Sequence, residues 1–122
     1  MSLFRAIPIH VHAALEVLAA PLLLVAPFAL GFSPLAGALS FALGVLLIGL
    51  AVSAYDSPGE RGSLPLAAHA GLDYTLAAAT IAVGILVGIA AGDLVATVFL
   101  VGFGFAHLAL TASTRFSRPL GA

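Results

Sequence analysis

Five ionisable side chains lie inside the apolar part of this sequence at spacings that could bring them together: His12, Glu16, His69, Asp73 and His107. His12 and Glu16 are one helical turn apart, and so are His69 and Asp73, so each pair lies on one face of its helix. Ionisable residues within a membrane span are costly and by default indicate a functional site. Imidazole and carboxylate groups are ligands for zinc, iron, copper, nickel or manganese. The pattern therefore predicts a metal or proton site.

Three interpretations of these side chains stay open at this level. In the first, each histidine and acid satisfy one another and serve as interhelical hydrogen bonds. In the second, they bind a transition metal or, ranked below it, a haem held between two of the histidines. A dinuclear carboxylate centre is disfavoured because such bundles use more carboxylates. In the third, Glu16 and Asp73 relay a proton that the histidines exchange with the cytoplasm.

The elements that must position these residues follow from an extreme composition. The chain has 122 residues, of which 62% are hydrophobic and 7% charged, and its mean hydropathy is +1.23. A water-soluble domain would have too few polar residues for its surface, so the lipid bilayer is the expected partner. The net charge of −1 without any lysine argues against nucleic acid, and the lack of cysteine removes thiolate ligands.

Four apolar stretches are each close to the ~20 residues that cross a bilayer as a helix. The breaks between them are short, which makes consecutive helices antiparallel neighbours. The sequence therefore predicts an all-α integral membrane four-helix bundle, a single domain over residues 1–122. The expected spans are Pro8–Gly31, Pro34–Tyr55, Pro65–Ala91 and Asp93–Thr114.

An internal repeat groups these spans into two helix pairs. The segment Ile7–Glu16 aligns without gaps on Leu64–Asp73, and Phe41–Gly44 aligns on Phe99–Gly102 after a one-residue slip. Repeat 1 covers about residues 7–56 and repeat 2 about residues 64–114. Because each copy crosses the membrane twice, we expect a pseudo-twofold axis along the membrane normal. That axis would bring the two His/acid pairs to one depth, which His107 also reaches.

Orientation follows from the arginines, which lie in the N-terminal arm, the central polar loop and the C-terminal tail. The positive-inside rule then places both termini in the cytoplasm. The first apolar run is long for a signal peptide and right for a span, so we expect it to stay in the membrane.

Helix packing and helix kinks have their own signals. The ridge Gly84-x-x-x-Gly88-x-x-x-Gly92 predicts close helix contacts, within the chain in preference to a dimer face. Pro21 and Pro27 lie inside the first span and should kink it, which frees backbone carbonyls near Val17 and Leu23.

The segment Leu24–Phe32, followed by a helix that contains Gly44, resembles the SPW-repeat family of small bacterial membrane proteins. The namesake Ser-Pro-Trp would fall at Ala26-Pro27-Phe28, where serine and tryptophan are replaced. The resemblance covers nearly the whole chain and implies a duplicated helix pair in a bacterial inner membrane. It supplies no activity, catalytic residue or cofactor.

Nothing in the sequence indicates an enzyme, since no nucleophile triad and no phosphate-binding glycine loop are present. We expect a small non-enzymatic binding or accessory protein with an intramembrane His/carboxylate site near the cytoplasmic side. One alternative is a proton-coupled transporter or pore that acts as a homo-oligomer. Another is a purely structural subunit of a larger membrane complex.

Overall fold

The computed structural model describes residues 5–54 and 65–117. Four helices make up most of this part of the chain, and each is long and apolar enough to cross a membrane. Their bounds agree with the predicted spans to within two residues, while the predicted repeat boundaries near residues 56 and 64 lie outside the described residues. The helices are α1 (Ile9–Ala29), α2 (Pro34–Ser53), α3 (Leu66–Ala91) and α4 (Leu94–Ala112).

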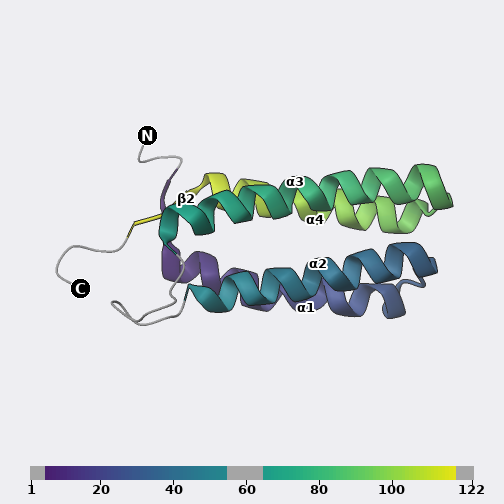
Figure 1. The fold of residues 1–122 in the computed structure, drawn as a ribbon, viewed down its shortest axis with the longest axis horizontal. Coiled ribbons are helices and arrows are strands. Elements are labelled where there is room, and N and C mark those ends of the chain that lie inside the picture. Colours follow the sequence, from purple (N-terminus) through teal and green to yellow (C-terminus); the bar gives the residue numbers. More distant parts are fainter. Residues whose placement is uncertain (1–4, 55–64, 118–122) are drawn as a thin grey trace.

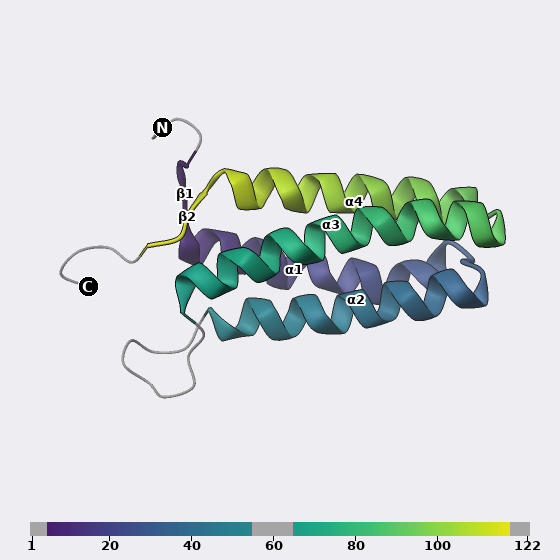
Figure 2. The ribbon, with the colours of Figure 1, turned by 45° about the horizontal axis from the view of Figure 1, so that its top comes forward.

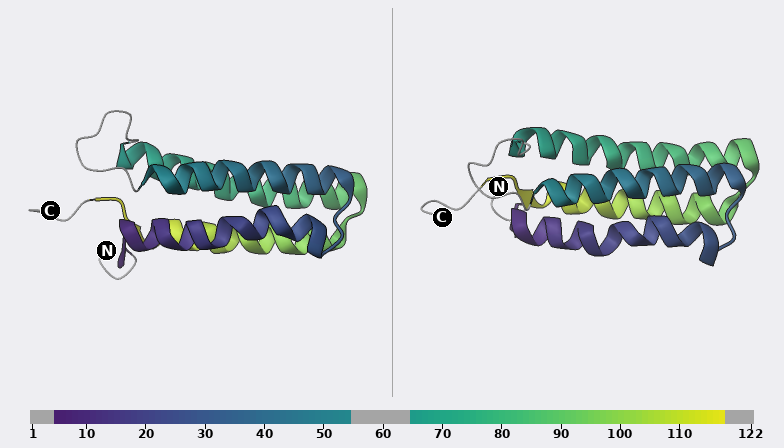
Figure 3. Two further views of the ribbon diagram at one scale, coloured as in Figure 1. Left: turned by 90° about the horizontal axis from the view of Figure 1, so that it is seen from below. Right: turned by 60° about the horizontal axis from the view of Figure 1, so that its bottom comes forward.

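The helices lie side by side as two antiparallel pairs (Figure 1). Helices α1 and α2 pack along their length, as do α3 and α4, and α2 also packs against α3. The backbones of α1 and α4 come close at few points, although the axes of all four helices are roughly aligned in the turned views (Figures 2 and 3). A side chain that bridges α1 to α3 or α4 therefore joins the two pairs.

Large apolar side chains are exposed along the surface of the bundle. Leu18, Phe28 and Ile89 are 73%, 79% and 81% exposed. The core holds mainly alanines and leucines, among them Ala20 and Leu23, together with Val87 and buried polar side chains. An apolar outside around a partly polar inside is the pattern expected of a bundle in lipid.

A short pair of strands, which the all-α prediction missed, closes one end of the bundle. Strand β1 (Ile7–Pro8) pairs in parallel with β2 (Thr114–Arg115), with Ile7 opposite Thr114. The backbone N–H of Ile7 also donates to the Ser113 carbonyl at 3.0 Å. This contact ties the start of α1 to the end of α4, and we call this end of the bundle the strand end.

At the opposite end, which we call the turn end, Asp93 joins the two helix pairs. Its Oδ1 accepts a hydrogen bond from the Ala96 N–H at 3.1 Å and so caps α4, while its Oδ2 accepts from the Ser33 N–H at 2.7 Å. Ser33 itself caps α2. These backbone hydrogen bonds lower the pKa of the Asp93 carboxyl below its usual value.

We expect Asp93→Asn to lower the melting temperature at neutral pH, because the amide keeps the shape but loses the charge at two N–H donors. A carboxyl whose pKa is lowered by folding stabilises the fold above its unfolded pKa and loses that contribution as the pH falls. Thermal unfolding of both proteins in detergent, as a function of pH, should show a difference that shrinks at acidic pH. A constant difference would mean that the charge is unimportant.

Two of the three ridge glycines bring α3 against α4. A Cβ atom on Gly84 would lie 3.0 Å from the Val101 backbone nitrogen, and one on Gly88 would lie 2.5 Å from Thr97 Oγ1. Gly92 has a different role from the one predicted. It has φ of +61° and ends α3 as a left-handed cap, and a Cβ atom added there would meet nothing within 4 Å.

Helix α1 continues through both Pro21 and Pro27. Because Pro27 has no N–H, the carbonyl of Leu23 loses its helical partner. Ser40 of α2 replaces that partner, since its hydroxyl donates to the Leu23 carbonyl at 2.7 Å while the serine is fully buried. The proline thus creates an acceptor that holds α1 to α2.

Ser40→Ala should therefore destabilise the bundle by about 1–3 kcal/mol, because it leaves a buried carbonyl unsatisfied. Ser40→Thr keeps the hydroxyl and serves as the control for its loss. Unfolding of the two variants in the same detergent measures the difference. Equal stability of Ser40→Ala and the unmodified protein would contradict this role for the hydroxyl.

Candidate metal centre

All five predicted site residues are buried together inside the bundle near the strand end. Helix α1 supplies His12 and Glu16, α3 supplies His69 and Asp73, and α4 supplies His107. Their exposed fractions are 0%, 1%, 1%, 0% and 6% in chain order of the residues. The cluster therefore joins α1 of one helix pair to α3 and α4 of the other.

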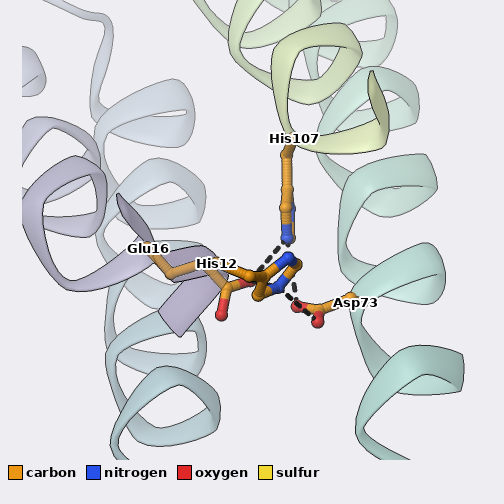
Figure 4. A group of neighbouring side chains, drawn as sticks. All are labelled: His12, Glu16, Asp73 and His107. Atoms are coloured by element: carbon orange, nitrogen blue, oxygen red, sulfur yellow. Dashed lines mark hydrogen bonds and ion pairs between the residues drawn. The ribbon is translucent and has the colours of Figure 1, made fainter. Parts of the chain in front are cut away.

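Each side of this interface supplies one carboxylate and one imidazole to a group of four side chains (Figure 4). His12 Nε2 lies 2.9 Å from Asp73 Oδ2 and 3.1 Å from Glu16 Oε2. His107 Nε2 lies 2.8 Å from the same Glu16 oxygen and 3.1 Å from Asp73 Oδ1. One donor atom from each of these four residues lies within 4.8 Å of the others.

His69 lies at the edge of this group of four. Its Nε2 is 3.1 Å from Asp73 Oδ2 and 3.6 Å from Glu16 Oε1, yet it forms no hydrogen bond with either oxygen. Among the described residues, both this nitrogen and Glu16 Oε1 are buried without any hydrogen-bond partner. Two unsatisfied atoms that can both accept a hydrogen bond or bind a cation thus face each other.

In two of the imidazoles, the Nδ1 atom, which points away from the carboxylates, lies next to a hydroxyl oxygen. Thr114 Oγ1 lies 2.8 Å from His12 Nδ1 and donates its own proton to the Leu110 carbonyl. Ser53 Oγ lies 3.4 Å from His69 Nδ1 and donates to the Leu50 carbonyl. Since each hydroxyl already donates its proton to a carbonyl, each imidazole must donate through Nδ1–H to the hydroxyl oxygen. In this orientation Nε2 of the ring lies toward the carboxylates.

The residues that follow α4 cover the cluster at the strand end. The Phe116 ring lies 5.3 Å from the His12 ring and 6.1 Å from the His69 ring, measured between centroids. Phe116, Thr114 and Ser53 were not predicted from the sequence. For Thr114 and Phe116 the available signal was a hydroxyl or aromatic residue just beyond the end of a helix that carries a buried histidine, whereas Ser53 ends α2, which has no histidine.

Three other polar side chains have different surroundings from the cluster. Thr111, one turn after His107, is buried, and its hydroxyl has no hydrogen-bond partner within the described part of the chain. His10 is exposed on α1 and stands outside the cluster. Asp93 is at the turn end and caps α4, far along the helix from His107.

The cluster has the composition of a cation site. Two carboxylates carry two negative charges, and within the described residues no arginine lies among the buried side chains around them. Two protonated imidazoles balance this charge in the metal-free site, and one divalent cation bound by neutral imidazoles would balance it equally. Nitrogen and oxygen donors without sulfur suit zinc, manganese, iron or nickel.

Comparisons of the chain with protein-family models, with curated proteins and with solved structures returned no match.

Proposed function

We propose that this chain is a non-enzymatic membrane protein that binds one divalent transition-metal ion between its two helix pairs. The ligands are His12, Glu16, Asp73 and His107, with His69 beside them as a fifth donor. The observation that carries this proposal is the convergence of four buried donor atoms, from three helices, to within 4.8 Å of one another.

The hydroxyl groups of Thr114 and Ser53 support this proposal. A histidine that binds a metal usually donates its other ring N–H to an oxygen, which fixes its tautomer and its direction. His12 and His69 both have such an oxygen at Nδ1. With Nδ1 as the donor, Nε2 of each ring points at the two carboxylates; in the metal-free site Nε2 of His12 donates a proton to Asp73 at 2.9 Å, and a cation that binds there would replace this proton.

The observed distances fit a metal-free site that changes shape slightly on binding. Ligands on opposite sides of an octahedral ion with bonds of about 2.1 Å are about 4.2 Å apart. The widest separation of 4.8 Å exceeds this value, while the shortest contacts of 2.8 Å are closer than neighbouring ligands need to be. Shifts of a few tenths of an ångström in side-chain positions would seat the ion.

A single ion is better supported than a haem. The rings of His12 and His69 are 5.9 Å apart, but the carboxylates of Glu16 and Asp73 lie against the nitrogens that would bind the haem iron. A macrocycle between these rings would have to expel both acids from their partners. The metal proposal uses the acids as ligands instead.

A proton relay across the membrane has less support. Between the cluster and the turn end, the interior is filled by an apolar core. The hydroxyls that lie along the described helices there, those of Ser40, Thr80 and Thr97, are occupied by backbone carbonyls. A proton that reached Glu16 would have no free polar side chain on which to continue within the described part of this chain.

We further propose that the strand end faces the cytoplasm of a bacterial inner membrane and that the chain is a tandem duplication. The placement of Arg5 just before β1 and of Arg115 within β2 supports the orientation. Buried positions recur between α2 and α4 when each helix is counted from its N-cap: Gly44 and Leu47 then correspond to Gly104 and His107, a register two residues away from the sequence alignment of Gly44 with Gly102. A family likeness to SPW-repeat proteins agrees with such a pair, and an accessory role within a larger membrane complex fits the small size.

Metal content of the protein purified in detergent tests the proposal. After loading with Zn²⁺ or Mn²⁺ and removal of excess ion, elemental analysis should find one ion per chain. His12→Ala should reduce this to well below one, whereas His10→Ala, which removes the exposed histidine of the same helix, should retain it. Equal metal content in the two variants would overturn the proposal.

A further inference from the structure

A crevice opens from the lipid-facing surface of the bundle onto one edge of the candidate metal centre. It has a volume of about 190 Å³ and lies between α1 and α4, with Leu47 of α2 at its back. Leu15 and Ala106 at its rim are exposed. Glu16 and His107 are the two polar residues that line it, so it links the lipid to the site.

Small side chains on the two facing helices make room for this crevice. Ala19 of α1 and Ala106 of α4 line it, while Phe103 supplies an aromatic wall one turn away. The backbones of α1 and α4 come close at few points, so side chains decide how much of the space between these two helices is filled. Its lining is otherwise aliphatic, which suits a flat apolar ring.

His107 differs from the other two histidines of the cluster in the surroundings of its outer nitrogen. Thr114 holds Nδ1 of His12, and Ser53 approaches Nδ1 of His69. Within the described ranges, 5–54 and 65–117, no hydrogen bond is formed by Nδ1 of His107, whose Nε2 contacts Glu16 and Asp73. A metal-binding His107 would therefore carry an Nδ1–H that lacks the usual acceptor.

We propose that the missing acceptor is a carbonyl oxygen of a lipid-soluble quinone that enters the crevice from the bilayer. This inference rests on the proposed metal site, because metal binding at Nε2 is what makes Nδ1 the donor. The apolar walls hold the ring, and the His107 Nδ1–H donates to one carbonyl. A phospholipid ester offers the same acceptor.

Depth favours the quinone over the phospholipid ester. His107 lies five residues before Ala112, where α4 ends, so it is about 8 Å inside that end at the helical rise of 1.5 Å per residue. Ester carbonyls stay at the boundary of the hydrocarbon layer, whereas a ring without a charged head group can reach this depth.

The test uses the full-length, zinc-loaded protein in nanodiscs of diether phospholipids, which have no ester carbonyl. The probes are duroquinone and durene, which share one ring and four methyl groups but differ in the carbonyls. Duroquinone should bind saturably at one per chain, about tenfold more tightly than durene, and should shift the nitrogen NMR signal of His107 Nδ1. Equal binding of the two probes would overturn the proposal.

Two variants and a change of lipid sharpen this result. Ala106→Leu fills the crevice without replacing a metal ligand and should weaken duroquinone binding at least about tenfold, whereas Ala109→Leu on the exposed surface of α4 should not. Binding retained in Ala106→Leu would contradict the assigned place. Binding that vanishes in diester nanodiscs would assign the crevice to the lipid ester and overturn the quinone.

Metal analysis of the same samples separates this inference from the proposed function. One zinc per chain without duroquinone binding would overturn the crevice ligand alone. Absence of zinc from the loaded protein would overturn the metal site first.

Discussion

Glu16→Gln combined with Asp73→Asn is expected to abolish the stabilisation of this protein by metal. In the unmodified protein, a single bound ion at a hundred times its dissociation constant should add about 2.7 kcal/mol to the free energy of unfolding. The double variant keeps the size and the hydrogen-bonding oxygen of both side chains but loses the two charges that balance the ion. Its melting temperature should be the same with and without Zn²⁺.

The same variant separates the metal site from simple pairing of buried polar groups. If Glu16 and Asp73 only pair with the histidines, the double variant loses stability equally with and without added ion, and the unmodified protein gains nothing from zinc. Asp93→Asn is the matched control, since it makes the same acid-to-amide change at the turn end. Thermal unfolding in detergent across a zinc titration distinguishes the two cases, and Asp93→Asn should keep the zinc-dependent shift.

Gly104→Val should cause the largest loss of packing. A Cβ atom at Gly104 would lie 2.5 Å from Ile81 Cγ1 and 3.0 Å from both the Ala77 carbonyl oxygen and the Ile81 backbone nitrogen. Backbone atoms cannot rotate away, so α3 and α4 must separate. Overpacking of this kind costs about 1–3 kcal/mol and sometimes more.

Because His107 is less than one turn beyond Gly104, the same separation should also weaken zinc binding. Gly102→Val is the control on the same helix, since a Cβ there meets nothing within 4 Å. Melting temperatures and zinc affinities of the two variants give the comparison. A Gly104→Val protein as stable as Gly102→Val would show that the α3–α4 contact is looser than described.

Much of the helical architecture follows from length and hydropathy, because lipid leaves a single apolar segment no alternative to a helix. The five clustered residues were also predictable, since His12, Glu16, His69 and Asp73 occur in matching segments and His107 lies at the same depth. The Leu23 carbonyl was expected to be freed by Pro27, and Ser40 is the partner that spacing alone did not reveal.

What could not be predicted depends on side chains brought together by tertiary packing. The two-residue strands carry no periodic signal, so Thr114 and Phe116 could not be placed over the histidines. Sequence symmetry pairs His12 with His69, whereas the structure groups His12 with His107 and leaves His69 at the edge. Leu47 occupies in α2 the place that His107 has in α4. Helix α4 therefore contributes a histidine to the cluster, whereas α2 contributes none.

X-ray absorption at the zinc edge of the loaded protein tests the central claim most directly. We predict a first shell of nitrogen and oxygen atoms only, with multiple scattering from two or three imidazoles, and its loss in Glu16→Gln with Asp73→Asn. A shell of oxygen alone without imidazole scattering, or a spectrum unchanged in the double variant, would contradict a metal centre at His12, Glu16, Asp73 and His107.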